Sequence, residues 1–259
     1  MVDKVHGVPL PPHDLVFMDP DARRGYELGV RFANRLGEIG VNVRDGLLLD
    51  IGCGYGRLAY GLLGVNFSGT YVGVDILPDR ITFLQNNFST AHPRYQFHLL
   101  EVRNDVYIKN HPQLSKSQQA FDIESIEDVD FSRYTNDTPD GIILLSVFTH
   151  MYDHDIVNYL RSMKRVMTRK SQLVFTAFVF NSGVLDRIDR GDAKLTFPHV
   201  LADHCRTRHA GKPLANIAYD EAWLARLLHA NGFDHEYIPG YWSGVASKHY
   251  QDWILARLV

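Results

Sequence analysis

A glycine-rich turn and the acid before it carry the clearest chemistry in this sequence. In LLLDIGCGYGRLA (47–59), Gly52, Gly54 and Gly56 alternate with larger residues directly after an apolar run. Glycine lets a ligand touch the backbone and permits positive φ, and a helix that follows such a turn favours negative charge at its N-terminus. Asp50 would repel a pyrophosphate over this turn but would attract an ammonium or sulfonium group. The stretch therefore predicts a nucleotide-like ligand that carries positive charge.

A second acid is placed to bind a ribose. The segment TYVGVD (70–75) has the apolar content of a buried strand and ends in Asp75. In nucleotide-binding α/β folds, an acid about 20 residues beyond the glycine turn, at the end of the next strand, hydrogen-bonds the ribose hydroxyls. Asp75 has this spacing, and Ile76 beside it provides an apolar wall for an adenine. A solvated carboxylate at the end of a strand is the alternative interpretation.

Buried strands and amphipathic helices alternate along the chain and position these groups. The alternation predicts an α/β fold with a doubly wound, Rossmann-like sheet, in which ligands lie outside the carboxyl ends of the parallel strands. Two further strands are expected near the C-terminus, around YIPGYW and YQDWILARL. We expect the buried strands at 47–51, 70–75, 95–100, 141–146 and 173–180.

The glycine turn resembles motif I of the class I S-adenosylmethionine-dependent methyltransferases, whose pattern is a hydrophobic strand, an acid and then GxGxG. The dinucleotide fingerprint GxGxxG differs, because its third glycine comes one residue later. Further segments resemble bacterial methyltransferases that are often found with glycosyltransferases in saccharide or natural-product pathways. These segments are LPPHDL, VGVDI, SVFTHM, AYDEAWLARLL and the terminal GYWSG and YQDWILARL. The resemblance implies a seven-stranded, mostly parallel sheet that is completed by a C-terminal antiparallel hairpin.

The same resemblance implies S-adenosyl-L-methionine as the cofactor. Two places could supply the acid that such enzymes use for the adenine amino group, namely Glu101 directly after the third predicted strand, or Ile126 and Glu127 within SIEDVDF. The sequence does not separate them, and a solvated acidic loop is a third interpretation. The other residues assigned to the cofactor are Asp50, Gly52, Cys53, Gly54, Gly56, Arg57, Asp75, Ile76 and Ser146.

His150 in SVFTHM is the candidate catalytic base. It follows the fourth predicted strand and should face the transferred methyl group, and a neutral imidazole with a pKa near 6.5 can accept a hydroxyl proton. Tyr26, on a helix predicted over 21–40, could orient this imidazole if the helix covers the site. In the alternative interpretations, His150 caps or packs the next helix and Tyr26 only packs its own helix on the domain.

These assignments predict methyl transfer to a hydroxyl of a small-molecule acceptor, a sugar or glycosylated metabolite. The saccharide class rests on the resemblance alone. An amine acceptor is the first alternative. The second alternative is a nucleotide-dependent oxidoreductase, which Asp50 and the GxGxG spacing disfavour. The third alternative is a non-catalytic partner that retains the fold.

No metal site is expected. A zinc site needs three or four converging ligands, and the spacing of His199, His204, Cys205 and His209 matches no zinc pattern. His150 and His154 lie one helical turn apart but lack the glutamate of HExxH.

The chain is long enough for one large domain. Its 259 residues can bury a sizeable α/β core. Residues 1–24 contain several prolines and are expected to form an irregular N-terminal arm, which leaves 25–259 as the methyltransferase domain. The segment 181–218 is too long for a simple connection and is a candidate substrate lid.

Composition argues against several other classes of protein. A net charge of −3 provides no electrostatic argument for nucleic acid or for an anionic membrane. Two cysteines make no disulfide framework, and the sequence has no apolar run long enough for a membrane span. We therefore expect a soluble cytoplasmic protein with a small-molecule partner, and the sequence carries no signal for its oligomeric state.

Overall fold

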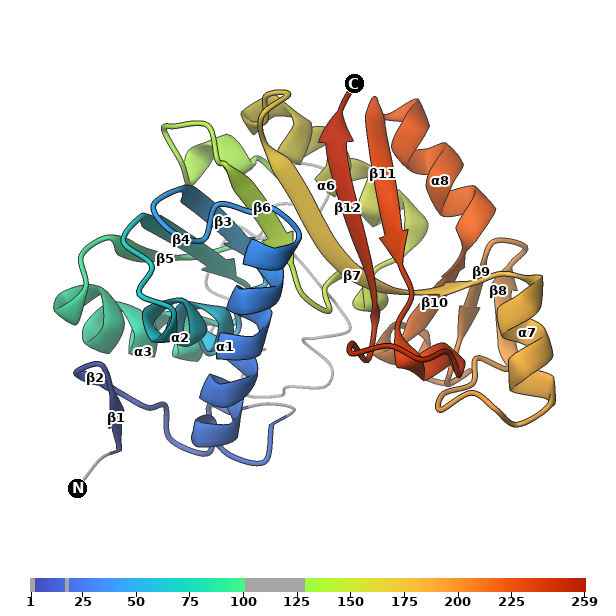
Figure 1. Ribbon diagram of the computed structural model, residues 1–259, viewed down its shortest axis with the longest axis horizontal. Helices are drawn as coiled ribbons and strands as arrows, with labels where there is room; N and C mark the ends of the chain where they lie inside the picture. Colours follow the sequence, from blue (N-terminus) through green and yellow to red (C-terminus); the bar gives the residue numbers. More distant parts are fainter. Residues whose placement is uncertain (1–2, 17–18, 101–128) are drawn as a thin grey trace. The chain divides into compact units, whose positions relative to one another are not determined.

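Short apolar strands build the first of two units into which the chain divides, residues 1–143 and 144–259. The computed structural model describes residues 3–16, 19–100 and 129–259 (Figure 1). In the N-terminal unit, β3 (Leu47–Ile51) pairs in parallel with β4 (Thr70–Asp75) and with β6 (Gly141–Leu144). β4 also pairs in parallel with β5 (Tyr95–Leu99). The buried parallel sheet that the apolar runs predict is thus confirmed.

Helices follow the strands of this unit. α1 (Ala22–Glu38) is capped by Asp21, whose side chain accepts a hydrogen bond from the backbone N–H of Arg24. α2 (Arg57–Gly64) follows the glycine turn. α3 (Pro78–Leu84) begins with proline and continues as a π-helix, η1 (Gln85–Ser89), and a 3₁₀ turn, η3 (Phe131–Arg133), precedes β6.

The N-terminal arm is packed rather than irregular. A short hairpin joins β1 (Lys4–Val5) to β2 (Val8–Pro9), and Val5, Val8 and Leu10 are buried. The Tyr60 hydroxyl donates to the carbonyl of Pro9, and Arg80 Nε donates to the carbonyl of Leu15 at 2.9 Å. The prediction of an irregular arm was based on its prolines and did not consider these apolar residues. The expected boundary at residue 24 falls inside α1.

The C-terminal unit is organised around β7 (Gln172–Phe180), which is buried along almost its whole length. β7 pairs in parallel with β10 (Ile217–Asp220) and antiparallel with β12 (Asp252–Leu258). β12 in turn pairs antiparallel with β11 (Phe233–Ile238). The expected antiparallel C-terminal hairpin is therefore confirmed, although its first strand ends before most of YIPGYW.

The segment expected as a lid contains regular structure. It holds α7 (Ser182–Asp189), β8 (His199–Ala202) and β9 (Cys205–Thr207), and β9 pairs antiparallel with both β8 and β10. The described residues thus contain β8, β9 and β10 in addition to the seven expected strands, while the α/β class is confirmed. The lid function itself stays a prediction. The other helices of the described residues are α6 (Asp153–Val166), α8 (Glu221–Ala230), η4 (Phe148–His150), η5 (Pro213–Ala215) and η6 (Tyr241–Ser243).

Across the ranges that the structure describes, none of the helices combines the length and apolar character needed to cross a bilayer.

Two glycines allow α1 to approach the backbone of α2. A Cβ added at Gly61 would lie 2.1 Å from the carbonyl carbon of Gly29, and one added at Gly29 would lie 2.1 Å from the carbonyl oxygen of Arg57. Contacts of this length are impossible for a real Cβ, so both positions require glycine. Because α2 starts at the glycine turn, this close packing also holds that turn in place.

We predict that Gly61→Ala destabilises the protein. Overpacking of a tight contact costs about 1–3 kcal/mol, which exceeds the gain of up to ~1 kcal/mol in helix propensity. Urea unfolding measures the change. Gly211→Ala is the control, because a Cβ there would meet no described atom within 4 Å. Equal stability of the two variants would contradict the account of the α1–α2 contact.

Candidate active site

The glycine turn has the backbone conformation that its sequence predicts. Gly52, Gly54 and Gly56 have φ values of 80°, 57° and 87°, a region that side chains disfavour. A Cβ at Gly56 would lie 2.7 Å from a methyl group of Leu84, whereas one at Gly54 would meet no described atom within 4 Å. The turn is therefore open at Gly54, where a ligand could lie against the backbone.

Asp75 ties the end of β4 to this turn. Its Oδ2 accepts the N–H of Gly54 at 2.7 Å, and its Oδ1 accepts the N–H of Leu77 at 3.0 Å. The carbonyl of Val74 also accepts the N–H groups of Gly52 and Cys53, at 2.8 and 3.1 Å. Burial raises the pKa of Asp75, and the two backbone N–H groups partly oppose this rise. The structure thus brings Asp75 and the turn together, as the spacing predicts.

Asp50 is a second buried carboxyl group in the same unit. It accepts a hydrogen bond from the hydroxyl of Tyr71. Burial raises its pKa to about 7, the hydrogen bond from Tyr71 opposes the rise, and the charge of Asp75 adds to it. Two buried acids, of which Asp75 raises the pKa of Asp50, form a site that a cation would stabilise. This electrostatic arrangement fits the ammonium and sulfonium groups of S-adenosylmethionine.

The other assigned residues of the turn are also close to it. Cys53 is buried, and burial followed by the charges of Asp75 and Asp50 raises the pKa of its thiol, so it is not a nucleophile. Ile76 is partly exposed, as a wall for an adenine must be. Arg57 begins α2 and places its guanidinium 5.3 Å from the ring centre of Phe32.

Asp19 is a residue of this region that the sequence interpretation missed. Its Oδ2 accepts hydrogen bonds from the hydroxyl of Tyr55 and from Nη1 of Arg57, the latter at 3.2 Å. The side chain of Asp19 is buried, so the ion pair is largely shielded from solvent. Asp19 is far from the turn in sequence and lies in the Pro-rich arm, so no local pattern could have indicated the contact.

Tyr26 does not lie at the glycine turn. Its hydroxyl is 3.5 Å from His6 Nε2, and a Cβ added at Gly64 would lie 2.9 Å from it. Gly64 is the last residue of α2, so about 12 Å of helix separates it from the turn. Tyr26 thus contacts the C-terminal end of α2. Its expected role of orienting the imidazole of His150 stays a prediction, beside the alternative in which it packs its helix.

The residues proposed for the adenine amino group cannot be placed. Glu101, Ile126 and Glu127 lie outside the described residues. Their assignment stays a prediction, with the alternatives open as before.

In the C-terminal unit, Ser146 occupies a strained position. Its φ is 63°, which is unusual for a residue other than glycine and is typical of functional sites. Its N–H donates to Thr176 Oγ1 at 2.8 Å, and its Oγ donates to Gln251 Oε1 at 2.7 Å. Thr176 Oγ1 donates to the same oxygen at 2.7 Å. The sequence interpretation found Ser146 but missed these two partners, which lie on β7 and just before β12.

The surroundings of His150 favour a neutral imidazole. Nδ1 lies 2.9 Å from the carbonyl oxygen of Leu214. A carbonyl only accepts, so Nδ1 carries a proton, and in the neutral ring Nε2 is then the basic nitrogen. Burial lowers the pKa of His150, and the carbonyls of Leu214 and Ala215 only partly oppose the change. A histidine in this state can act as a base at neutral pH.

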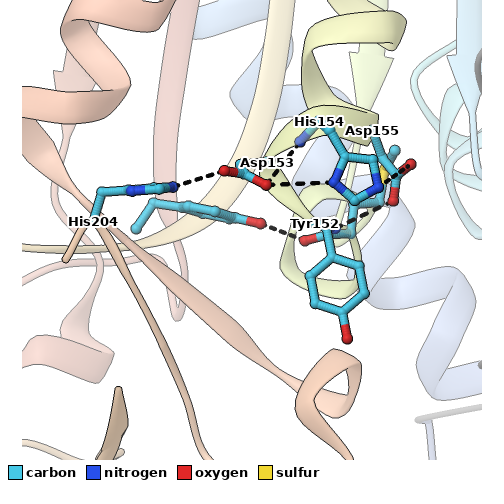
Figure 2. A network of polar contacts seen from close by, with 7 residues as sticks. Tyr152, Asp153, His154, Asp155 and His204 are labelled. Atoms are coloured by element: carbon cyan, nitrogen blue, oxygen red, sulfur yellow. Dashed lines mark hydrogen bonds and ion pairs between the residues drawn. The ribbon is translucent and has the colours of Figure 1, made fainter. Parts of the chain in front are cut away.

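A polar network holds the residues after His150 against the expected lid segment. Figure 2 shows His204 facing Asp153, with Nε2 and Oδ2 2.9 Å apart. The Tyr219 hydroxyl donates to the carbonyl of Met151, and the Trp223 ring stacks on His204 at 4.4 Å. Burial raises the pKa of Asp153, but the hydrogen bond from His204 and other contacts outweigh it, so the pKa lies below its usual range.

Histidine and acidic side chains in this network do not form a metal site. Nδ1 of His154 lies 3.5 Å from Oδ1 of Asp153, and Nε2 of His154 lies 3.3 Å from Oδ1 of Asp155. Within the ranges that the structure covers, no three His, Cys, Asp or Glu side chains converge in a way that could hold a metal ion.

Comparison with known proteins identifies the family to which this site belongs. Residues 44–232 match the family model described as a methyltransferase domain, which is more than half of the 259 residues.

The fold is also similar to those of solved methyltransferases. The glycopeptide N-methyltransferase MtfA, complexed with (S)-adenosyl-L-methionine, has a TM-score of 0.55 at 11% identity, with 89% of this chain and 94% of that chain covered. A putative O-methyltransferase from Nostoc punctiforme PCC 73102 has a TM-score of 0.56 at 15% identity, with coverage of 90% and 56%. The 1,6-didemethyltoxoflavin-N1-methyltransferase of Burkholderia thailandensis has a TM-score of 0.50 at 16% identity, with coverage of 91% and 78%.

We predict that Asp50 makes the stability of the unliganded protein fall as pH rises. Its folded pKa of about 7 exceeds the ordinary value of 3.8. Between these values the folded chain holds a proton that the unfolded chain releases, so the stabilisation is complete below about pH 4 and is lost by about pH 7. The upper bound on this change is ~4 kcal/mol.

Asp50→Asn tests this prediction by urea unfolding across this pH range. The amide oxygen of Asn can still accept from Tyr71 but does not titrate. The variant should match the parent near pH 4 and be more stable than the parent at pH 8. Parallel pH profiles of the two proteins would show that Asp50 is not the group responsible.

Proposed function

This chain belongs to the methyltransferase domain family and uses S-adenosylmethionine, and we propose that it methylates a hydroxyl group of a small molecule. The acceptor that we propose is a sugar or a glycosylated metabolite. The state of His150 carries this proposal, because a neutral hydroxyl must lose a proton during methyl transfer whereas a neutral amine needs no base beforehand.

The N-terminal unit would hold the cofactor. Asp75 would accept hydrogen bonds from the ribose hydroxyls, the turn around Gly54 would lie along the amino acid end, and Asp50 would compensate its positive charge. Ile76 would contact the adenine. Support comes from the open space at Gly54 and from the two buried acids, whose pKa values are raised mainly by burial.

The C-terminal unit would hold and activate the acceptor. S-adenosylmethionine supplies an electrophilic methyl group, which the acceptor oxygen displaces from sulfur. Nε2 of His150 would take the proton of that hydroxyl and become an imidazolium, which the carbonyls of Leu214 and Ala215 favour. Ser146, held by Gln251 and Thr176, would contact the cofactor, as its sequence assignment has it.

The nature of the acceptor rests on two further arguments. The similar structures include a glycopeptide N-methyltransferase and a putative O-methyltransferase, so methyl transfer to either element occurs on this fold. The saccharide class is supported by the resemblance of segments such as SVFTHM to methyltransferases found with glycosyltransferases. A screen of sugars, phenols and amines with methyl-labelled cofactor tests both points, and a product methylated on nitrogen would overturn the hydroxyl assignment.

We predict that Asp75→Ala weakens the binding of S-adenosylhomocysteine by at least tenfold. The substitution removes two charge-assisted hydrogen bonds to the ribose, each worth about 1.5–3 kcal/mol, and it also releases Gly54. Calorimetry measures the affinity, and circular dichroism confirms that the variant is folded. Asp79→Ala, an exposed acid four residues away, should bind like the parent. Unchanged affinity in a folded Asp75→Ala protein would refute the ribose assignment.

We predict that His150→Ala lowers kcat by about 10²–10⁴-fold, the usual contribution of general-base assistance, and leaves cofactor affinity nearly unchanged. Initial rates at saturating cofactor measure kcat on the acceptor that the screen identifies. His229→Ala provides the control, because His229 is exposed near the end of α8. Full activity of His150→Ala would remove the proposed base without affecting the cofactor site.

A further inference from the structure

Two tyrosines of the C-terminal unit expose their rings side by side. Tyr241 is 40% exposed and Tyr250 is 42% exposed, which places them among the few large hydrophobic side chains that the described surface presents. Their ring centres lie 5.4 Å apart, with an angle of 54° between the planes. The two rings therefore form an inclined aromatic surface that solvent reaches.

Buried aromatic residues hold this surface rigidly. The Tyr250 ring lies at 83° to that of Phe178, with centres 5.9 Å apart. Phe178 packs in turn on Trp242, whose Nε1 donates to Asp252 at 2.7 Å. The N–H of Trp242 also donates to the carbonyl of Tyr250 at 3.1 Å. A surface fixed in this way loses little conformational entropy when a ligand binds to it.

The tyrosine pair adjoins the Ser146 network. Asp252 pairs with Ala177 at the start of β12, so Tyr250 and Gln251 lie beside the carboxyl end of β7. The carboxamide oxygen of Gln251 accepts from Ser146 and from Thr176, which directs its amide nitrogen to other partners. The aromatic surface and a set of neutral polar groups therefore meet at the edge where the acceptor is proposed to bind.

The chemistry of this surface matches a saccharide ring. The face of an aromatic ring is negative, and the C–H groups on one face of a sugar are weakly positive, so the two stack. The hydroxyls on the rim of the sugar need neutral hydrogen-bonding groups, which the tyrosine hydroxyls and Gln251 supply. A purely apolar ligand would leave these groups unpaired.

We propose that Tyr241 and Tyr250 form a subsite that binds a saccharide ring of the acceptor by stacking. The proposal rests on the proposed function and extends it, because it names the side chains that select the acceptor. It assigns no part in proton transfer to either tyrosine, so the two residues determine specificity.

Saturation-transfer NMR on the full chain with S-adenosylhomocysteine tests the subsite without turnover. The probes are methyl glycosides of glucose, rhamnose and fucose, with phenol for comparison. We expect transfer to the protons of one face of at least one glycoside, and a loss of at least fivefold in Tyr250→Ala. Tyr250→Phe, which retains the ring, should keep the signal, as should Leu201→Ala, whose exposure of 40% is similar.

Several outcomes would overturn the subsite. These are no transfer to any glycoside in the parent protein, equal transfer in the parent and in Tyr250→Ala, or a tyrosine-dependent signal from phenol alone. Failure of the proposed function looks different. If glycosides bind through Tyr250 but only amines are methylated, the proposal of hydroxyl methylation is wrong and the subsite is supported. If a glycoside is methylated with an unchanged KM in Tyr250→Ala, the subsite is wrong and the proposed function is supported.

Discussion

The candidate site depends on one carboxylate, that of Asp75, which accepts the backbone N–H groups of Gly54 and Leu77. These two bonds join the glycine turn to the end of β4, so the part of the chain that would meet a ligand is held to the acid that would recognise its ribose. Burial opposes the charge of this carboxylate and raises its pKa. A ligand that donates hydroxyl groups to it would offset that cost, so the same interaction both shapes the turn and favours binding.

The two units provide different electrostatic environments. In the N-terminal unit, Asp50 and Asp75 are buried together, which is unfavourable unless a cation compensates them. In the C-terminal unit the proposed active groups are neutral, and hydrogen bonds rather than charges hold them. Thr176 accepts the backbone N–H of the strained Ser146, Gln251 accepts its hydroxyl, and Leu214 fixes the tautomer of His150. A cationic methyl donor and the proposed neutral hydroxyl acceptor would require these two environments.

Local spacing made the arrangement around the glycine turn predictable. The acid, the alternating glycines and Asp75 lie within 26 residues, and their positions follow from a strand, a turn and the next strand. Their roles toward a cofactor stay predictions. Contacts between distant residues were not predictable. Asp19 reaches Arg57, and Gln251 reaches Ser146, only because the chain folds back within each unit. The role expected for Tyr26 stays a prediction. β8 was missed because its four residues are mostly exposed, and β9 was missed because it has only three residues.

A crystal structure of the complex with S-adenosylhomocysteine tests the central claim most directly. The account predicts that both ribose hydroxyl oxygens lie within about 3.2 Å of the Asp75 carboxylate, and that the amino acid end lies along the turn at Gly54 on the side of Asp50. A ribose bound away from Asp75, or a nucleotide that does not contact the glycine turn, would contradict the account.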